Sequence, residues 1–247
     1  MIMGNKMIGI VGGVGSYAGL DLIRKIYDHT DARSDQEHLP VSMLSVPHTI
    51  GDRTEYLLGV TDVNPGRSIA GVITTLVSQG AEVIGIPCNT AHASSIYDVI
   101  LEMSPDNCKI IHMIEEVARE IVSSGAVSKI GLLGTTGTLS SDIYKDTLAG
   151  YGIEVIYPSA DIQSLFVHPA IYHHDYGIKV YSNPVITKAR DDLFMAASYL
   201  SRKGAEAIIL GCTEIPLALT EGAIDDVPLI DATTLLAKAL IRESQAA

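Results

Sequence analysis

Two cysteines stand at matching places in the sequence. Cys88 and Cys212 each end a short apolar run and are each followed by polar residues suited to cap a helix. A thiol at a helix N-terminus has its pKa, ordinarily about 8.5, lowered toward neutrality, which makes it an effective base. A thiolate on one face of a carbon can remove a proton while a thiol on the other face returns one. Such a pair inverts a stereocentre and in principle requires no cofactor.

The two thiols are predicted to be inequivalent. Glu214 lies two residues after Cys212, and His92 lies four residues after Cys88. A carboxylate raises a thiol pKa and an imidazolium lowers it, so we expect Cys88 to be the more acidic thiol. The third cysteine, Cys108, stands beside a strand start and is interpreted as a small buried hydrophobic residue.

The elements that carry the two cysteines are repeated within the chain. The stretch 6–16 resembles 128–138, and each is a strand that enters a glycine-rich turn. The stretch 76–88 aligns without gaps on 200–212, with Leu, Gly-Ala-Glu, Ile and the final Cys at the same offsets. We therefore predict a duplicated domain in which the two cysteines are equivalent residues.

Short β-branched runs alternate with helical patterns along the chain and lack polar alternation, which is typical of parallel strands covered on both faces. We predict an α/β fold of two pseudo-symmetric domains, each a parallel sheet flanked by helices, with the active site in the cleft between them. The first domain is predicted over residues 1–114 plus 228–247, and the second over 115–227.

Composition excludes several classes of protein. The chain has 247 residues, 47% of them hydrophobic, and a net charge of −12. Without a basic cluster, neither nucleic acid nor an anionic membrane is an expected partner. The apolar runs are far shorter than a membrane span, the start of the chain does not resemble a signal peptide, and a cytoplasmic location is expected.

The motifs around the cysteines resemble those of the aspartate/glutamate racemase family, nearest to its aspartate racemase branch. They are Pro87-Cys88-Asn89-Thr90-Ala91-His92 and Leu210-Gly211-Cys212-Thr213-Glu214-Ile215-Pro216, with supporting matches at 35–41, 52–54 and 134–138. The resemblance implies racemisation of an amino acid without pyridoxal phosphate, by two cysteines in the roles of Cys88 and Cys212. It also suggests a homodimer.

The resemblance assigns substrate-binding roles to several further residues. Asn89, Thr90 and Thr213 would bind the α-carboxylate or amino group, together with Thr135 and Thr138 of the second glycine turn. Arg53 and Lys179 would hold the side-chain carboxylate. From the residues alone, Asn89, Thr90 and Thr213 could simply be helix caps, and the two cations could be solvated surface charges.

Other functions compete with aspartate racemisation. The same thiols could serve a glutamate or broad-specificity racemase or a maleate-isomerase-like enzyme, and the chain could be a non-catalytic small-acid binding protein. The run 13–18 fits a dinucleotide-binding turn, but no acidic residue closes the second strand to bind ribose. His48, His92, His168, His173 and His174 lack the spacing of a metal site, so no metal and no cofactor are expected.

Overall fold

The computed structural model describes residues 5–125 and 127–246, and these divide into two compact units. The first comprises Met1–Glu116 with Thr233–Ala247, and the second comprises Val117–Ala232. The predicted division at 114/115 and 227/228 differs most at its second boundary. Strand β9 (Val227–Asp231) pairs with β7 (Ala207–Gly211), which holds it in the second unit.

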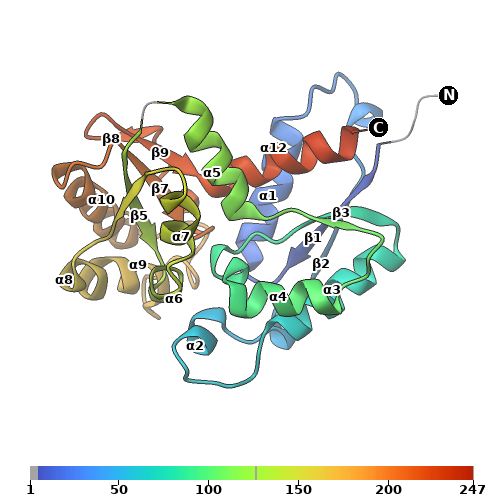
Figure 1. The fold of residues 1–247 in the computed structure, drawn as a ribbon, viewed down its shortest axis with the longest axis horizontal. Coiled ribbons are helices and arrows are strands. Elements are labelled where there is room, and N and C mark those ends of the chain that lie inside the picture. The colour runs from blue at the N-terminus through green and yellow to red at the C-terminus, as the bar shows by residue number, and fades with distance from the viewer. Residues whose placement is uncertain (1–4, 126, 247) are drawn as a thin grey trace. The chain divides into compact units, whose positions relative to one another are not determined.

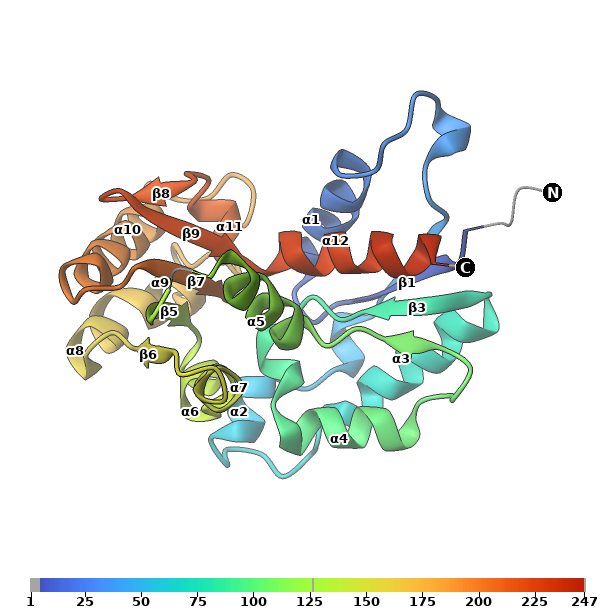
Figure 2. The same cartoon turned by 45° about the horizontal axis from the view of Figure 1, so that its top comes forward.

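The first unit is built on a parallel sheet with strand order β2-β1-β3-β4. Leu76 of α3 packs against one face of the sheet, while Leu22 of α1 and Leu240 of α12 pack against the other, at Gly85. Figure 2 shows α12 lying along β1 and β3 on the side away from α3 and α4. The elements are β1 (Met7–Gly12), α1 (Ser16–Asp28), β2 (Val41–Ser45), α2 (Arg53–Leu57), α3 (Gly66–Ser78), β3 (Ala81–Gly85), α4 (Ser94–Met103), β4 (Lys109–Ile110) and α12 (Ala232–Gln245), with 3₁₀ turns at Asp35–Glu37, Pro47–Thr49 and Asn89–His92.

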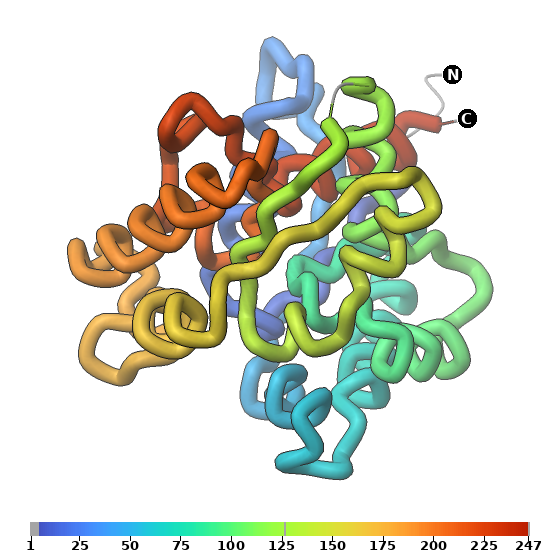
Figure 3. Tube along the Cα trace, turned by 60° about the vertical axis from the view of Figure 1, so that its left-hand side comes forward, coloured from blue at the N-terminus to red at the C-terminus, as the bar shows by residue number. Residues whose placement is uncertain are grey.

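The second unit has the strand order β6-β5-β7-β9-β8, parallel except for the antiparallel edge strand β8. Helix α10 covers the sheet, and the segment that includes α9 runs beside α10, as Figure 3 shows. The elements are β5 (Lys129–Gly134), α6 (Thr136–Ser140), α7 (Ile143–Ala149), β6 (Glu154–Ile156), α8 (Ala160–Ile162), a π-helical turn (Gln163–Val167), α9 (His168–Tyr172), α10 (Thr187–Arg202), β7 (Ala207–Gly211), α11 (Ile215–Ala218), β8 (Ala223–Ile224) and β9. Helix α5 (Met113–Ser124) carries the chain from the first unit into the second (Figure 1).

Equivalent glycines show how closely the two units repeat one another. A Cβ added at Gly9 of β1 would lie 2.7 Å from Ile84, 2.8 Å from Ala81 and 3.4 Å from Leu76. A Cβ added at Gly131 of β5 would meet Ile208 and Leu200 at 3.1 Å and Ala205 at 3.2 Å. These neighbours are the pairs that the sequence repeat aligns, offset for offset. The repeat therefore extends from sequence to helix-on-strand packing, and the predicted fold class of two α/β domains with parallel sheets is confirmed.

Alanine at these two glycines is expected to test the equivalence. Gly9→Ala should lower the free energy of unfolding by about 2 kcal/mol, because its new methyl would overlap the rigid Cβ of Ala81. Gly131→Ala should cost about 1 kcal/mol or less, since its contacts are longer. Urea denaturation measures both changes.

Gly71→Ala provides the control for that experiment. Gly71 lies inside α3 with no heavy atom within 4 Å of an added Cβ. Its replacement should raise stability by up to about 1 kcal/mol through helix propensity alone. Equal destabilisation by all three alanines would contradict the packing argument.

Candidate functional site

Cys88 lies just beyond β3, at the rim of the core of the first unit. Its backbone is extended, and a single 3₁₀ turn, Asn89–His92, follows before α4 begins. Cys88 is 7% exposed and belongs to the hydrophobic cluster that includes Ile84 and Ile86. The helix at this thiol is therefore one short turn rather than a long helix, so it offers little of the helix dipole expected from the sequence.

His92 contacts the Cys88 segment through the backbone. Its Nδ1 lies 2.9 Å from the carbonyl oxygen of Cys88, and its ring packs against the rings of Tyr97 and His112. Complete burial, and next the charge of His112, lower the pKa of His92 to about 3. The prediction that an imidazolium at His92 acidifies the Cys88 thiol is therefore wrong, because this ring is neutral near pH 7.

Arg53 begins α2 and is buried, so it is not a solvated surface charge. Its guanidinium donates to the carbonyl oxygens of Val14 and of Gly51, the latter at 2.9 Å. Helix α2 also contacts the 3₁₀ turn that carries Asn89 and Thr90. The first unit thus gathers a buried cation, two polar side chains and a thiol within neighbouring segments.

Cys212 lies just beyond β7 in the second unit and is 4% exposed. Its Sγ donates to Oε2 of Glu214, 3.1 Å away, and the hydroxyl of Thr213 lies 3.4 Å from the same oxygen. Burial, and next the charge of Glu214, raise the pKa of the Cys212 thiol well above its usual value, while Lys179 acts in the opposite direction. Cys212 therefore keeps its proton at neutral pH.

Lys179 forms an ion pair with Glu214, the residue that accepts a hydrogen bond from the Cys212 thiol. Its Nζ lies 2.7 Å from Oε1 of Glu214 and 5.7 Å from the ring centroid of Tyr172. The Lys179 side chain is 22% exposed and that of Glu214 is 4% exposed. The interpretation of Lys179 as a solvated surface charge is therefore wrong.

Thr135 and Thr138 form the turn at the end of β5. Thr135 caps α6 by accepting from the backbone N–H of Thr138 at 3.1 Å, and their hydroxyl oxygens lie 3.0 Å apart. Both side chains are buried. Gly134 and Gly211 are paired across β5 and β7, so this turn and Cys212 follow neighbouring strand ends at one edge of the sheet. Ligands of open α/β sheets bind at such edges.

Gln163 is a residue of this region that sequence reasoning missed. It begins the π-helical turn, is buried, and donates from Nε2 to the carbonyl oxygen of Gly134 at 3.1 Å. Its hydrogen-bond partner is a backbone oxygen 29 positions away, and no pattern of residue types predicts such a contact. The π-helical turn that positions the Gln163 side chain cannot be predicted from the sequence either.

Backbone packing, rather than a bound dinucleotide, explains the glycine turn after β1. Gly13 has φ of +85°, and a Cβ there would lie 2.7 Å from the backbone nitrogen of Pro47. The close approach of the segment after β2 thus requires glycine at this position. This packing accounts for the motif, so it no longer favours a phosphate-binding interpretation.

The chain matches a known protein family over most of its length. The model of the Asp/Glu/Hydantoin racemase family matches residues 11–240. The chain belongs to this family. It is similar to the solved structure of Picrophilus torridus aspartate racemase, with a TM-score of 0.80 and 30% identity over 97% of this chain and 94% of that chain. The resemblance seen in the sequence is confirmed, and with it the prediction of an enzyme of the racemase class.

Curated members of the racemase family differ in their named substrates. A broad-specificity amino-acid racemase of Bacillus subtilis is 26% identical over 240 residues, which cover 95% of this chain and 96% of that protein. A glutamate racemase of Corynebacterium kroppenstedtii is 28% identical over 224 residues, 87% of this chain. The match covers 66% of that relative, so this chain spans just under two thirds of its length.

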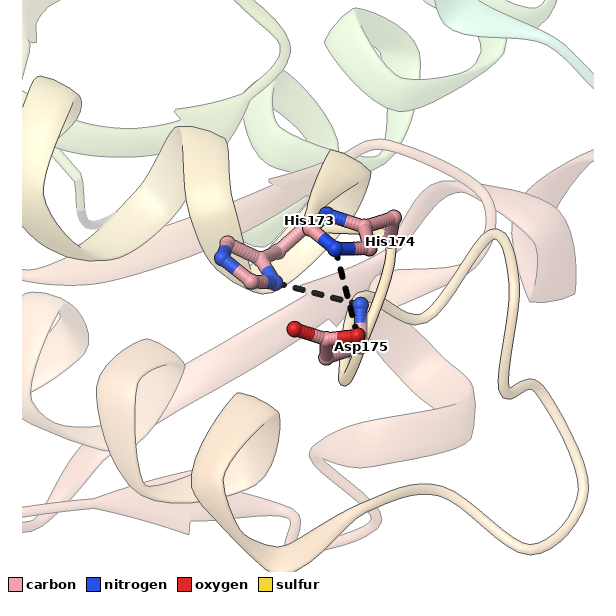
Figure 4. A group of neighbouring side chains, drawn as sticks. All are labelled: His173, His174 and Asp175. Carbon is pink, nitrogen blue, oxygen red and sulfur yellow. Dashed lines mark hydrogen bonds and ion pairs between the residues drawn. The ribbon is translucent and has the colours of Figure 1, made fainter.

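Three consecutive residues of the second unit bring possible metal ligands together. Figure 4 shows His173, His174 and Asp175, whose potential ligand atoms lie within 4.8 Å of one another. They come from consecutive residues, and the side chains of His174 and Asp175 are 84% and 72% exposed, so we assign this group no function.

Across residues 5–125 and 127–246, the helices lack the combined length and apolarity that crossing a bilayer requires.

Proposed function

We propose that this chain is a cofactor-independent amino-acid racemase that favours aspartate and moves protons at Cα with Cys88 and Cys212. The observation that carries the proposal is that equivalent strands, β3 and β7, each lead into a buried cysteine at equivalent offsets of a structural repeat. A two-base inversion needs one such group from each side of the carbon. The proposal requires both thiols to reach one Cα from opposite faces.

The protonated state of Cys212 gives the first step its direction. Because its pKa is raised, Cys212 is the proton donor at rest, and the proposal assigns the role of resting base to Cys88. A thiolate at Cys88 would take the Cα proton, and the Cys212 thiol would give one to the opposite face. The enzyme then holds the proton on Cys88, ready for the reverse reaction.

The substrate would be held by charged and polar groups from both units. Arg53, which is buried and already oriented by two carbonyl groups, suits a carboxylate because guanidinium binds such groups bidentately. Asn89, Thr90, Thr135, Thr138 and Thr213 are proposed for the α-carboxylate and amino group, and Lys179 for the side-chain carboxylate. The aspartate preference is supported by the similarity to the Picrophilus aspartate racemase.

A glutamate or broad-specificity racemase is the second candidate. The similarity to the Corynebacterium glutamate racemase and to the Bacillus broad-specificity enzyme favours it. In this candidate too, the chain would use Cys88 and Cys212, so only the pocket around the substrate side chain separates it from the first proposal.

Deuterium incorporation at Cα tests the proposal. Purified protein, reduced and without added cofactor, is incubated in D₂O separately with L- and D-aspartate, and exchange is followed by proton NMR. We expect label to enter from both enantiomers. Exchange with glutamate alone would favour the second candidate. No exchange with any amino acid would contradict the racemase and favour a maleate-isomerase-like enzyme or a binding protein.

A further inference from the structure

The second unit contains a partly buried ion pair, and the acidic member of that pair also accepts a hydrogen bond from a thiol. Lys179 pairs with one carboxylate oxygen of Glu214, at 2.7 Å, and Cys212 donates to the other, at 3.1 Å. Glu214 thus accepts from a cation and a thiol at once. We propose that Lys179 is a positioning residue for Cys212 that acts through Glu214, beyond any contact that Lys179 makes with substrate.

Burial explains why Glu214 depends on Lys179. The Glu214 side chain is only 4% exposed, and a carboxylate so buried is costly to ionise unless a positive charge is close. Lys179 supplies that positive charge at Oε1, while Glu214 accepts the thiol hydrogen at Oε2. The ion pair therefore fixes both where the Cys212 proton points and how firmly it is held.

The position of Lys179 is in turn set by α9. The backbone N–H of Lys179 donates to the carbonyl oxygen of Ile171 at 3.1 Å, and its ammonium lies over the ring of the next residue, Tyr172. An ammonium within about 6 Å of an aromatic face gains further stabilisation. Lys179 is thus held by its own backbone, by an aromatic ring and by Glu214.

The charged groups acting on Cys212 are few in the part of the chain that the structure describes. Glu214 raises the pKa of the thiol and Lys179 lowers it, after the larger effect of burial. Burial, and next the charge of Asp231 at the end of the neighbouring strand β9, raise the pKa of Tyr144. Opposite changes to the first two groups should therefore shift the titration of Cys212 in opposite directions.

The experiment titrates Cys212 directly, without substrate. Cys88→Ala and Cys108→Ala together leave Cys212 as the single thiol, and its ¹³Cβ chemical shift is followed by NMR from neutral to alkaline pH in the folded chain. Glu214→Gln should lower the titration midpoint by about one pH unit or more, because a negative charge is removed. Lys179→Met should raise it by about one unit, which is roughly a tenfold loss of thiolate at fixed pH.

Two variants serve as controls. Lys179→Arg keeps the positive charge and should leave the midpoint within a few tenths of a unit. Lys188 makes a similar ion pair in the same unit, 2.8 Å from the buried carboxylate of Asp192 and 4.8 Å from the ring centroid of Tyr176, but with no thiol beyond it. Lys188→Met should therefore leave Cys212 unchanged while losing a comparable salt bridge.

The outcomes separate this inference from the proposed function on which it rests. Shifts in the same direction for Glu214→Gln and Lys179→Met, or no shift in either, would overturn the positioning role. A Lys179→Met variant that raises KM for aspartate but leaves the Cys212 midpoint in place would show that Lys179 serves substrate only. If opposite shifts occur in a chain that exchanges no Cα proton, the charge network stands and the racemase proposal alone fails.

Discussion

Replacing either Cys88 or Cys212 with alanine should lower racemisation of aspartate about a thousandfold or more. A positioned acid or base contributes about 10²–10⁴-fold, and an inversion in which each thiol serves one face cannot proceed with a single thiol. The measurement is the rate at which the optical rotation of L- or D-aspartate is lost, with Cα exchange in D₂O followed in parallel. Both variants should fold as the native chain does, because each loses only one buried sulfur atom.

Cys108→Ala is the matched control for these variants. Cys108 is partly buried and its Sγ donates to the carbonyl oxygen of Pro105, so the change removes a thiol and a weak hydrogen bond. It should leave racemisation within about twofold of the native rate, since its packing role is small. Retention of full activity by Cys88→Ala or Cys212→Ala would exclude the two-thiol mechanism.

Acid should destabilise the first unit through His92. The pKa of His92 is about 3 in the folded chain against 6.5 for an ordinary histidine, so the unfolded chain binds more protons between these values. The contribution is complete above the unfolded pKa and is lost as pH falls. Between about pH 6.5 and about 4.5 the free energy of unfolding should drop by about 2.5 kcal/mol from this group.

His92→Phe should remove that part of the pH dependence. Phenylalanine preserves an aromatic ring beside Tyr97 and His112 but cannot be protonated. Stability is measured by urea denaturation at several pH values, and the readout is the slope with pH rather than the absolute value. His48→Gln, at an exposed position, should leave the slope unchanged. An unaltered slope in His92→Phe would mean that other groups set the acid sensitivity.

Repetition and residue type made much of the fold predictable. Residues 66–78 carry a helical pattern and residues 154–156 include a short β-branched run, and the structure forms α3 and β6 over these bounds. Helix α4 is harder to predict, since its β-branched residues weaken the helical signal. The edge strand β8 is also hard to predict, because a two-residue strand depends on its neighbour rather than on its own sequence.

The candidate site was predicted by residue type but not by electrostatics. The strand ends that carry Cys88 and Cys212 could be located from apolar runs, whereas the charge of His92 could not be judged without its burial. Likewise, Lys179 and Glu214 are 35 positions apart, and only the folded second unit brings them together. Site chemistry depends on such long-range contacts more than the identities of the elements do.

The return of the chain into the first unit has a consequence for folding during synthesis. The second unit is one continuous stretch, so it can form as soon as its own residues have left the ribosome. The first unit must wait for α12, whose Leu240 packs on Gly85 of β3. Until then, that face of the sheet that carries Cys88 has only the part of its cover that Leu22 of α1 provides, and this half of the protein is the one that a chaperone would have to protect.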